Sequence, residues 1–251
     1  MTNSPELRRR LVVVSRDDYN LARSAAPDLL SDPFTTVVPV PLRPPWTEVP
    51  QLRAVEESLE PGALLVRNRW DGGAYVTSVE AYERFSVAKF NLVAAVCQRL
   101  GAHRLEVQEA RELSDEGRVT ARVEFQAGAA RGDGSVGHEQ LHRVAQSIQG
   151  TWTWRDGVVD AAAARRLADE CGLGTDPVVS GLIRQRSTDV NLLREQIMEL
   201  DVTSEAQREI QFALKVESLL RKLGPSFGGT FARTQAHSQH LRLRVHVSFD
   251  P

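Results

Sequence analysis

Apolar residues recur at intervals of three and four between Thr77 and Gly101, a spacing that predicts a long helix. Thr77 and Glu80 have the spacing of a capping box at its start, and Gly101 is the type of residue that ends a helix. Residues 105–125 then alternate apolar and polar side chains on both sides of a polar turn that contains glycine. Such alternation is typical of antiparallel strands with one face on a core and one in water. The segment therefore predicts an α-β-β unit.

A second stretch near the C-terminus repeats this pattern. Ser204 and Gln207 again have capping-box spacing, Gly224 corresponds to Gly101, and residues 243–249 alternate like a strand. Two α-β-β units indicate an α+β fold, with one antiparallel sheet backed by the two long helices. Internal duplication is one explanation of the match. The other is that any two amphipathic helix-and-strand segments align this well, because the apolar pattern supplies most of the matching positions.

The segment before the second unit has the pattern of another long helix. Asp176 followed by Pro177 is a strong helix start. A heptad seam, interrupted only by Arg186, follows with spacings of four and three: Val179, Ile183, Val190, Leu193, Ile197 and Leu200. Because only residues 201–203 separate this helix from the next, the two predict a long antiparallel helical hairpin. The seam either packs within that hairpin or forms a surface for self-association or for a partner.

The N-terminal region has the pattern of a small α/β segment. Residues 11–14 form a continuous apolar run, which predicts a buried strand, and Ser15 is placed to cap a helix over residues 16–26. Residues 34–42 contain prolines that limit them to an edge or extended segment. We divide the chain into an N-terminal segment (1–76), a first α-β-β unit (77–157), and the helical hairpin with the second unit (158–251). The three parts are expected to form one compact domain.

Charge and cysteine content narrow the possible functions. The chain has 251 residues and a net charge of −2, so it lacks the basic footprint of general nucleic-acid binding. Its two cysteines lie on expected helices, which argues against a disulfide framework and for a reducing compartment. No apolar run approaches the roughly 20 residues that cross a bilayer. We expect a cytoplasmic protein of bacterial type, with membrane contact by its amphipathic hairpins only as a minor alternative.

One short motif carries chemistry. The segment His-Glu-Gln-Leu-His at residues 138–142 matches the H-E-x-x-H pattern, in which two histidines bind zinc and the glutamate activates its water. In these five residues the chain resembles the zincin metallopeptidases. The resemblance implies His138 and His142 as zinc ligands, Glu139 as the general base, and a downstream third ligand, for which Glu170 is best placed. The competing interpretation is a polar helix start, because a glycine-rich loop precedes the motif.

Other catalytic patterns are absent from the sequence, including a nucleophile elbow, a phosphate-binding loop and a paired-cysteine metal site. Four tryptophans, Trp46, Trp70, Trp152 and Trp154, either pack in the core or line a pocket. These features favour a non-enzymatic protein-interaction or effector module without a cofactor, which acts through self-association or through a protein partner. The alternative is a zinc-dependent hydrolase. Residues 126–137, rich in alanine and glycine, are a candidate processing site.

Overall fold

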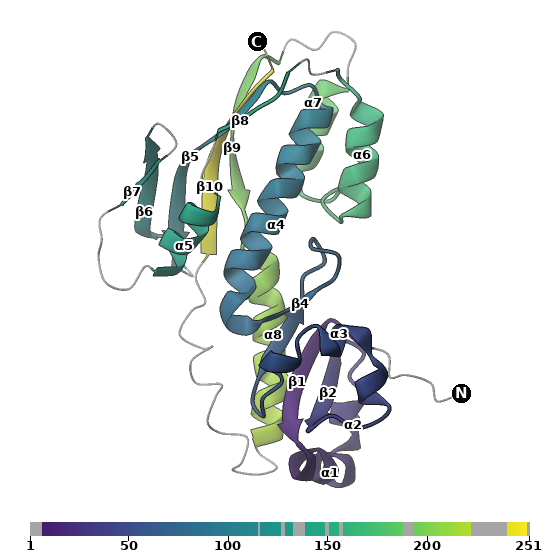
Figure 1. Ribbon diagram of the computed structural model, residues 1–251. Helices are drawn as coiled ribbons and strands as arrows, with labels where there is room; N and C mark the ends of the chain where they lie inside the picture. The colour runs from purple at the N-terminus through teal and green to yellow at the C-terminus, as the bar shows by residue number, and fades with distance from the viewer. Residues whose placement is uncertain are drawn as a thin grey trace. The chain divides into compact units, whose positions relative to one another are not determined.

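The computed structural model describes residues 7–114, 116–126, 129–132, 139–148, 151–155, 158–187, 193–221 and 240–249. It contains both helices and sheets, which confirms the predicted α+β class. The chain divides into two compact units, Met1–Arg84 with Glu205–Ser238 (unit 1) and Phe85–Ser204 with Gln239–Pro251 (unit 2). The division falls inside helix α4 (Ser78–Arg99) and at the first residue of helix α8 (Ser204–Arg221). Each unit is therefore built from two separate parts of the sequence (Figure 1).

Unit 1 contains a four-stranded sheet in the order β2-β1-β3-β4. Its strands are β1 (Arg10–Ser15), β2 (Thr35–Val40), β3 (Leu64–Arg67) and β4 (Tyr75–Thr77). β1 and β2 run parallel, and the chain between them forms helices α1 (Arg16–Ala25) and α2 (Pro27–Leu30). The other two pairs are antiparallel. β2 stands at one end of this order, as the prolines in and beside it predict.

The start of unit 1 folds as its sequence predicts. Residues 11–14 are buried along β1, and α1 begins directly after the strand. The Ser15 hydroxyl accepts a hydrogen bond from the Asp18 amide at 3.1 Å and so caps this helix. A cap of this kind stabilises a helix by about 1 kcal/mol.

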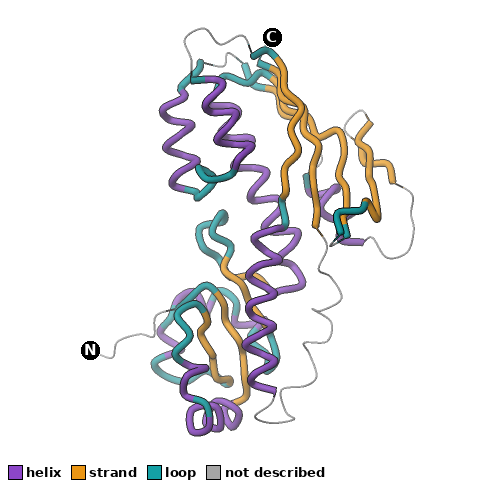
Figure 2. Tube along the Cα trace, turned by 180° about the vertical axis from the view of Figure 1, so that it is seen from behind, coloured by secondary structure: helices purple, strands orange, loops and turns teal. Residues whose placement is uncertain are grey.

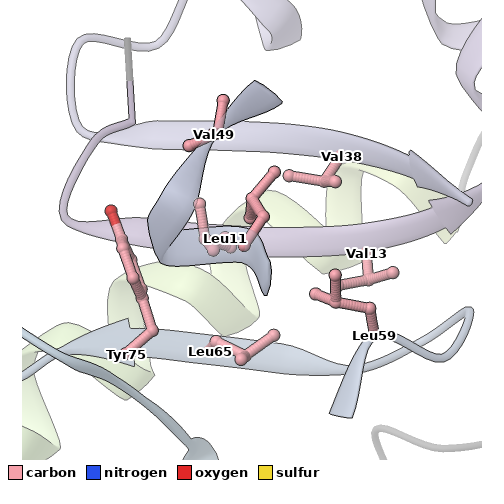
Figure 3. Packing of buried hydrophobic residues seen from close by; sticks show 8 residues of the cluster. Leu11, Val13, Val38, Val49, Leu59, Leu65 and Tyr75 are labelled. Atoms are coloured by element: carbon pink, nitrogen blue, oxygen red, sulfur yellow. The ribbon is translucent and has the colours of Figure 1, made fainter. Parts of the chain in front are cut away.

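The core of unit 1 lies on both faces of its sheet. One face is covered by the segment that contains the 3₁₀ helices η1 (Trp46–Glu48) and η2 (Glu56–Ser58) and helix α3 (Pro50–Arg53). Figure 3 shows the side chains that converge there, which belong to the cluster Leu11, Val13, Val38, Val49, Leu52, Leu59, Leu65 and Tyr75. The cluster on the other face is Val12, Val14, Ala22, Val37 and Leu64. β1 supplies alternate residues to both clusters, which is why its sequence is a continuous apolar run.

A tight turn joins β3 to β4. The backbone amide of Asn68 donates to the Ala74 carbonyl at 2.8 Å, and Nδ2 of the Asn68 side chain donates to the Arg84 carbonyl at 3.2 Å. Gly73 has a φ of 76°, which disfavours any residue with a Cβ atom. A Cβ atom at Gly73 would also lie 2.6 Å from Nε of Arg67, which donates to the Gly73 carbonyl.

Unit 2 contains a six-stranded sheet in the order β7-β6-β5-β10-β9, with β8 also paired to β5. The strands are β5 (Arg104–Leu113), β6 (Val119–Gln126), β7 (Ala129–Gly132), β8 (Thr151–Thr153), β9 (Glu195–Asp201) and β10 (His240–Ser248). Every pairing in this sheet is antiparallel, and Figure 2 shows the strands as one layer. The hairpin predicted for residues 105–125 is confirmed as β5 and β6.

Helices pack on the apolar face of this sheet. Phe90 of α4 lies against Trp152 of β8, with ring centroids 4.9 Å apart. Helix α5 (Glu139–Ser147) contacts β5, β6 and β7 and has Leu141 and Val144 buried. Helices α6 (Ala161–Glu170) and α7 (Pro177–Arg186) contact each other and lie side by side in Figure 1.

A buried lysine holds three elements of unit 2 together. Nζ of Lys89 on α4 lies 2.7 Å from the carbonyl oxygen of Asp201 and 3.1 Å from Oδ2 of Asp176. Asp176 is the N-cap of α7, because its Oδ1 accepts from the amides of Val178 and Val179. One ammonium group thus connects α4, the start of α7 and the end of β9.

The prediction that one long helix forms the first arm of a helical hairpin is wrong. α7 ends at Arg186, and residues Glu195–Asp201 form β9, which pairs with β10 along its length. Met198 and Leu200 are buried, whereas Ile197 is 50% exposed, so the segment alternates with period two. Its residues fit both a helical and a strand pattern, and pairing with β10 selects the strand.

The predicted duplication is not confirmed. The sheet of unit 2 joins β5 and β6 from the first predicted α-β-β unit to β10 from the second. Residues 222–239 of the second unit, and most of the candidate processing site at 126–137, lie outside the described residues. Within the described ranges, no helix combines the length and the apolar character that crossing a membrane requires.

Candidate functional site

The zinc motif can be placed only in part. α5 begins at Glu139, and His142 lies half-buried on it, whereas His138 and the side chain of Glu139 lie outside the described residues. Glu170 is exposed at the end of α6. Among the side chains that the structure describes, no three of His, Cys, Asp or Glu are grouped so that they could hold a metal ion. The site with His138, His142 and Glu170 as ligands and Glu139 as base therefore stays a prediction.

The residues of the predicted seam do not form one surface. Val179 and Ile183 are buried on α7, Leu200 is buried on β9, and Leu193 is half-buried between these elements. Ile197 is exposed on β9, and Val190 lies outside the described residues. The physical reason is the change from helix to strand, which breaks the common face that a single helix would give.

Arg186, the residue that interrupts the predicted seam, has a structural role at the end of α7. Its Nε and Nη2 donate to the Leu100 carbonyl at 3.2 and 3.1 Å, and its Nη1 donates to the Leu193 carbonyl at 3.1 Å. The guanidinium also lies 4.2 Å from the ring centroid of Phe249. Arg186 therefore fastens α7 to the end of α4 and to the segment before β9.

The other face of the unit 2 sheet carries paired charges. Arg111 donates from Nε and Nη2 to the two carboxylate oxygens of Glu109, both at 2.7 Å, and Arg122 forms an ion pair with Glu109. The hydrogen bond from Arg111, together with the charges of Arg111, Arg122 and Arg244, holds the pKa of Glu109 below its usual range. Glu199 forms a further ion pair with Arg111 at 3.3 Å. Glu109 is therefore held by two arginines, and Arg111 connects it to Glu199 on β9.

Unit 1 presents a different arrangement, a row in which cations alternate with aromatic rings. The order is Arg9, Phe34, Arg10, Phe212 and Lys215, which we call the cation–aromatic row. The guanidinium carbons of Arg9 and Arg10 lie 5.2 and 5.9 Å from the Phe34 ring centroid. That of Arg10 lies 4.8 Å from the Phe212 centroid, and Nζ of Lys215 lies 5.0 Å from it. All four distances are within the range of cation–π attraction.

The row is assembled from three parts of unit 1. Arg10 begins β1, Phe34 directly precedes β2, and Phe212 and Lys215 lie on α8 (Figure 1). The Arg10 amide donates to the Phe34 carbonyl at 3.1 Å, so the first two parts are joined through the backbone. The Tyr75 hydroxyl donates to the Arg8 carbonyl just before the row. Burial raises the pKa of Tyr75 to about 12, although the charge of Arg67 opposes this, so the hydroxyl stays protonated and keeps donating.

A carboxylate fixes the centre of the row. Nε of Arg10 lies 2.6 Å from Oε2 of Glu209, and these side chains are only 6% and 14% exposed. Nη1 of Arg9 lies 3.9 Å from Oε1 of the same carboxylate, but the Arg9 side chain is 65% exposed. Arg10 is therefore a buried support between the two rings, whereas Arg9 and Lys215 are cations in solvent at the ends.

The rings of the row are accessible. Phe34 is 46% exposed and Phe212 is 45% exposed, although large apolar side chains are normally covered in a folded chain. Aromatic residues and arginine are the types that protein interfaces favour most. With three cations and one carboxylate, the row attracts a negatively charged group and offers it an apolar neighbour.

Sequence reasoning did not find this site. Phe34 and Phe212 are far apart in the sequence, and neither belongs to a motif. The sequence signal that could have indicated the site is the run Arg8-Arg9-Arg10 directly before the apolar residues of a buried strand. An arginine that is buried there needs a side chain that compensates its charge.

The chain was compared with protein-family models, with curated proteins and with solved structures, and none of the three comparisons gives a match.

Proposed function

We propose that this chain is a non-enzymatic interaction module that binds an acidic segment of a partner protein through the cation–aromatic row. The observation that carries the proposal is the exposure of Phe34 and Phe212, each near half, on the two sides of the buried Arg10. Two accessible rings at the centre with cations at both ends have the anatomy of a small binding hot spot.

The charges select the partner. Arg9 and Lys215 stand at the ends of the row and are exposed, so carboxylates that approach them keep part of their hydration. The rings between them add contact area for an apolar side chain. A segment in which acidic and apolar residues alternate therefore fits the row. A nucleic acid fits less well, because the chain as a whole has a net charge of −2.

The expected contribution of each ring follows from its exposure. Truncation of an interface hot-spot residue costs about 2 kcal/mol or more. Because about half of each ring is already covered within unit 1, we expect about 1 kcal/mol from the remaining half, a change of about fivefold in Kd.

Fluorescence anisotropy with a labelled peptide of about eight residues, in which glutamate and leucine alternate, tests the proposal. We expect saturable binding that weakens with added salt and is absent for the peptide in which glutamine replaces glutamate. Phe34→Ala and Phe212→Ala should each raise Kd about fivefold, and Arg9→Gln should raise it about threefold.

Two exposed residues of unit 1 outside the row provide matched controls. Leu21→Ala removes an apolar side chain that is 40% exposed on α1, and Arg43→Gln removes an exposed cation. Both should leave the peptide affinity unchanged. The proposal is overturned if the acidic peptide does not bind, or if the control variants weaken binding as much as Phe212→Ala. It is also overturned if the row variants do not weaken binding of the peptide but do weaken binding of another ligand. The other ligands to test are anionic vesicles, a single-stranded oligonucleotide and a second copy of the chain.

A further inference from the structure

A cleft of about 390 Å³ in unit 2 lies outside every site considered so far. It is lined by the last turn of α4, by residues 154, 155, 158 and 160 between β8 and α6, and by Ala163 of α6. Apolar contact is offered by Trp154, Ala95 and Val158, the last of which is 82% exposed. The volume falls in the range of small-molecule sites, which is about 300–1,000 Å³.

Backbone hydrogen bonds fix the walls of this cleft. The Trp154 amide donates to the His103 carbonyl at 2.9 Å, and the Asp160 amide donates to the Arg99 carbonyl at 2.7 Å. The Asp160 side chain caps α6 by accepting from the Ala163 amide at 2.7 Å. The tryptophan is therefore anchored to the residue directly before β5, and the start of α6 is anchored to the end of α4.

The polar side chains that line the cleft are those of two arginines, one glutamine and one aspartate. Arg99 and Arg155 both line it and are exposed, and neither forms an ion pair with any residue in the described ranges. Asp160 is the carboxylate among the described lining residues, and its Oδ1 accepts from the Ala163 amide, so one positive charge of the two arginines is in excess over the charge of Asp160. Two guanidinium groups beside an indole thus remain available for a ligand.

We propose that this cleft binds a small planar anion, an aromatic ring that carries a phosphate or a carboxylate. The ring packs against Trp154, since stacking on an aromatic side chain contributes about 1–3 kcal/mol. The anionic group binds to Arg99 and Arg155, whose planar guanidinium groups match the oxygens of phosphates and carboxylates. This site is separate from the cation–aromatic row, so it makes the protein responsive to a small molecule as well as to a partner.

Isothermal titration calorimetry with two anionic probes tests the proposal, adenosine monophosphate for the phosphate and indole-3-acetate for the carboxylate. Adenosine and indole are control ligands that carry only the ring, and inorganic phosphate is a control ligand that carries only the anionic group. We expect at least one anionic probe to bind about tenfold more tightly than its uncharged ring, and which probe does so identifies the anionic group.

The variants separate the contributions of ring and charge. Arg99→Gln and Arg155→Gln should each raise Kd for the anionic probe about fivefold and leave the uncharged ring unaffected. Trp154→Leu should weaken both by about tenfold. Arg165→Gln, an exposed arginine of α6 outside the cleft, should change neither.

Three results overturn the proposal: no saturable binding of either anionic probe, equal binding of charged and uncharged rings, or the same loss in Arg165→Gln as in Arg99→Gln. If Trp154→Leu does not fold, as judged by circular dichroism, the two arginine variants still decide the question because they change exposed side chains. Phe212→Ala should leave probe binding intact, so this site and the proposed function can fail independently.

Discussion

The ion pair between Arg10 and Glu209 should be a major stabilising contact of unit 1. The two groups approach to 2.6 Å, and their side chains are 6% and 14% exposed. Removing one partner of a buried pair costs about 3–5 kcal/mol, because the other charge is left without compensation. In Glu209→Gln the two phenylalanine rings still face the guanidinium, and the amide oxygen can still accept a hydrogen bond. We therefore expect a loss of about 2–3 kcal/mol in the free energy of unfolding.

A double-mutant cycle isolates the interaction itself. The free energies of unfolding of Glu209→Gln, Arg10→Met and the double variant are measured by urea denaturation, with tryptophan fluorescence as the signal. We expect a coupling energy of about 2 kcal/mol, since Arg10→Met alone leaves the carboxylate poorly compensated and the double variant removes both charges.

The pair between Arg69 and Glu205 provides an internal control on the same helix. Its atoms are 3.7 Å apart, and its side chains are 52% and 23% exposed. Exposed pairs of this kind contribute about 0.2–1 kcal/mol, so its coupling energy should be several times smaller. A coupling between Arg10 and Glu209 no larger than that of this control would refute the argument that burial makes the pair strong.

Three further predictions concern other parts of the chain. Glu109→Gln should lower the urea midpoint more at about pH 7 than at about pH 3. Because the pKa of Glu109 is lowered in the folded state, the stabilisation by its carboxylate is full above the unfolded value of about 4.3 and is lost as pH falls through the folded value. Burial raises the pKa of Cys97 to about 12, so a thiol reagent should label Cys171 in the native protein and reach Cys97 only after unfolding. In Cys171→Ser, labelling of the native protein should therefore be lost. Gly72→Ala and Gly73→Ala should each lower the free energy of unfolding by about 1 kcal/mol, because both positions have positive φ, and Gly73→Ala should cost more because the Arg67 guanidinium must move and gives up its hydrogen bond to the Gly73 carbonyl.

Local chemistry explains which elements were predictable. The run at residues 11–14 and the cap at Ser15 specify β1 and α1 through contacts with their own neighbours in the chain. The alternation in residues 105–125 likewise specifies β5 and β6, because a turn brings the two strands together. Such signals lie within a few residues of one another, so reasoning from the sequence can find them.

Other features depend on contacts between distant segments. Residues 195–201 satisfy the spacing of a helix and of a strand, and only β10 decides between them. The cation–aromatic row requires β1, the start of β2 and α8 to meet, so no single stretch of sequence contains its pattern. The candidate zinc ligands His138 and His142 belong to a local motif, whereas a third ligand such as Glu170 depends on how distant segments fold.

The strand order of unit 2 has a consequence for how the protein is made on the ribosome. β10 lies between β5 and β9 in the sheet, although both of those strands are synthesised before it. At about 5–20 residues per second, roughly 6–25 seconds pass between the synthesis of β5 and that of its neighbour β10. Strand edges without their partner readily pair with other chains, so the newly made protein should be prone to aggregation during this interval. Unit 2 therefore completes its sheet only after translation has passed residue 248, and protection by a chaperone should matter most until then.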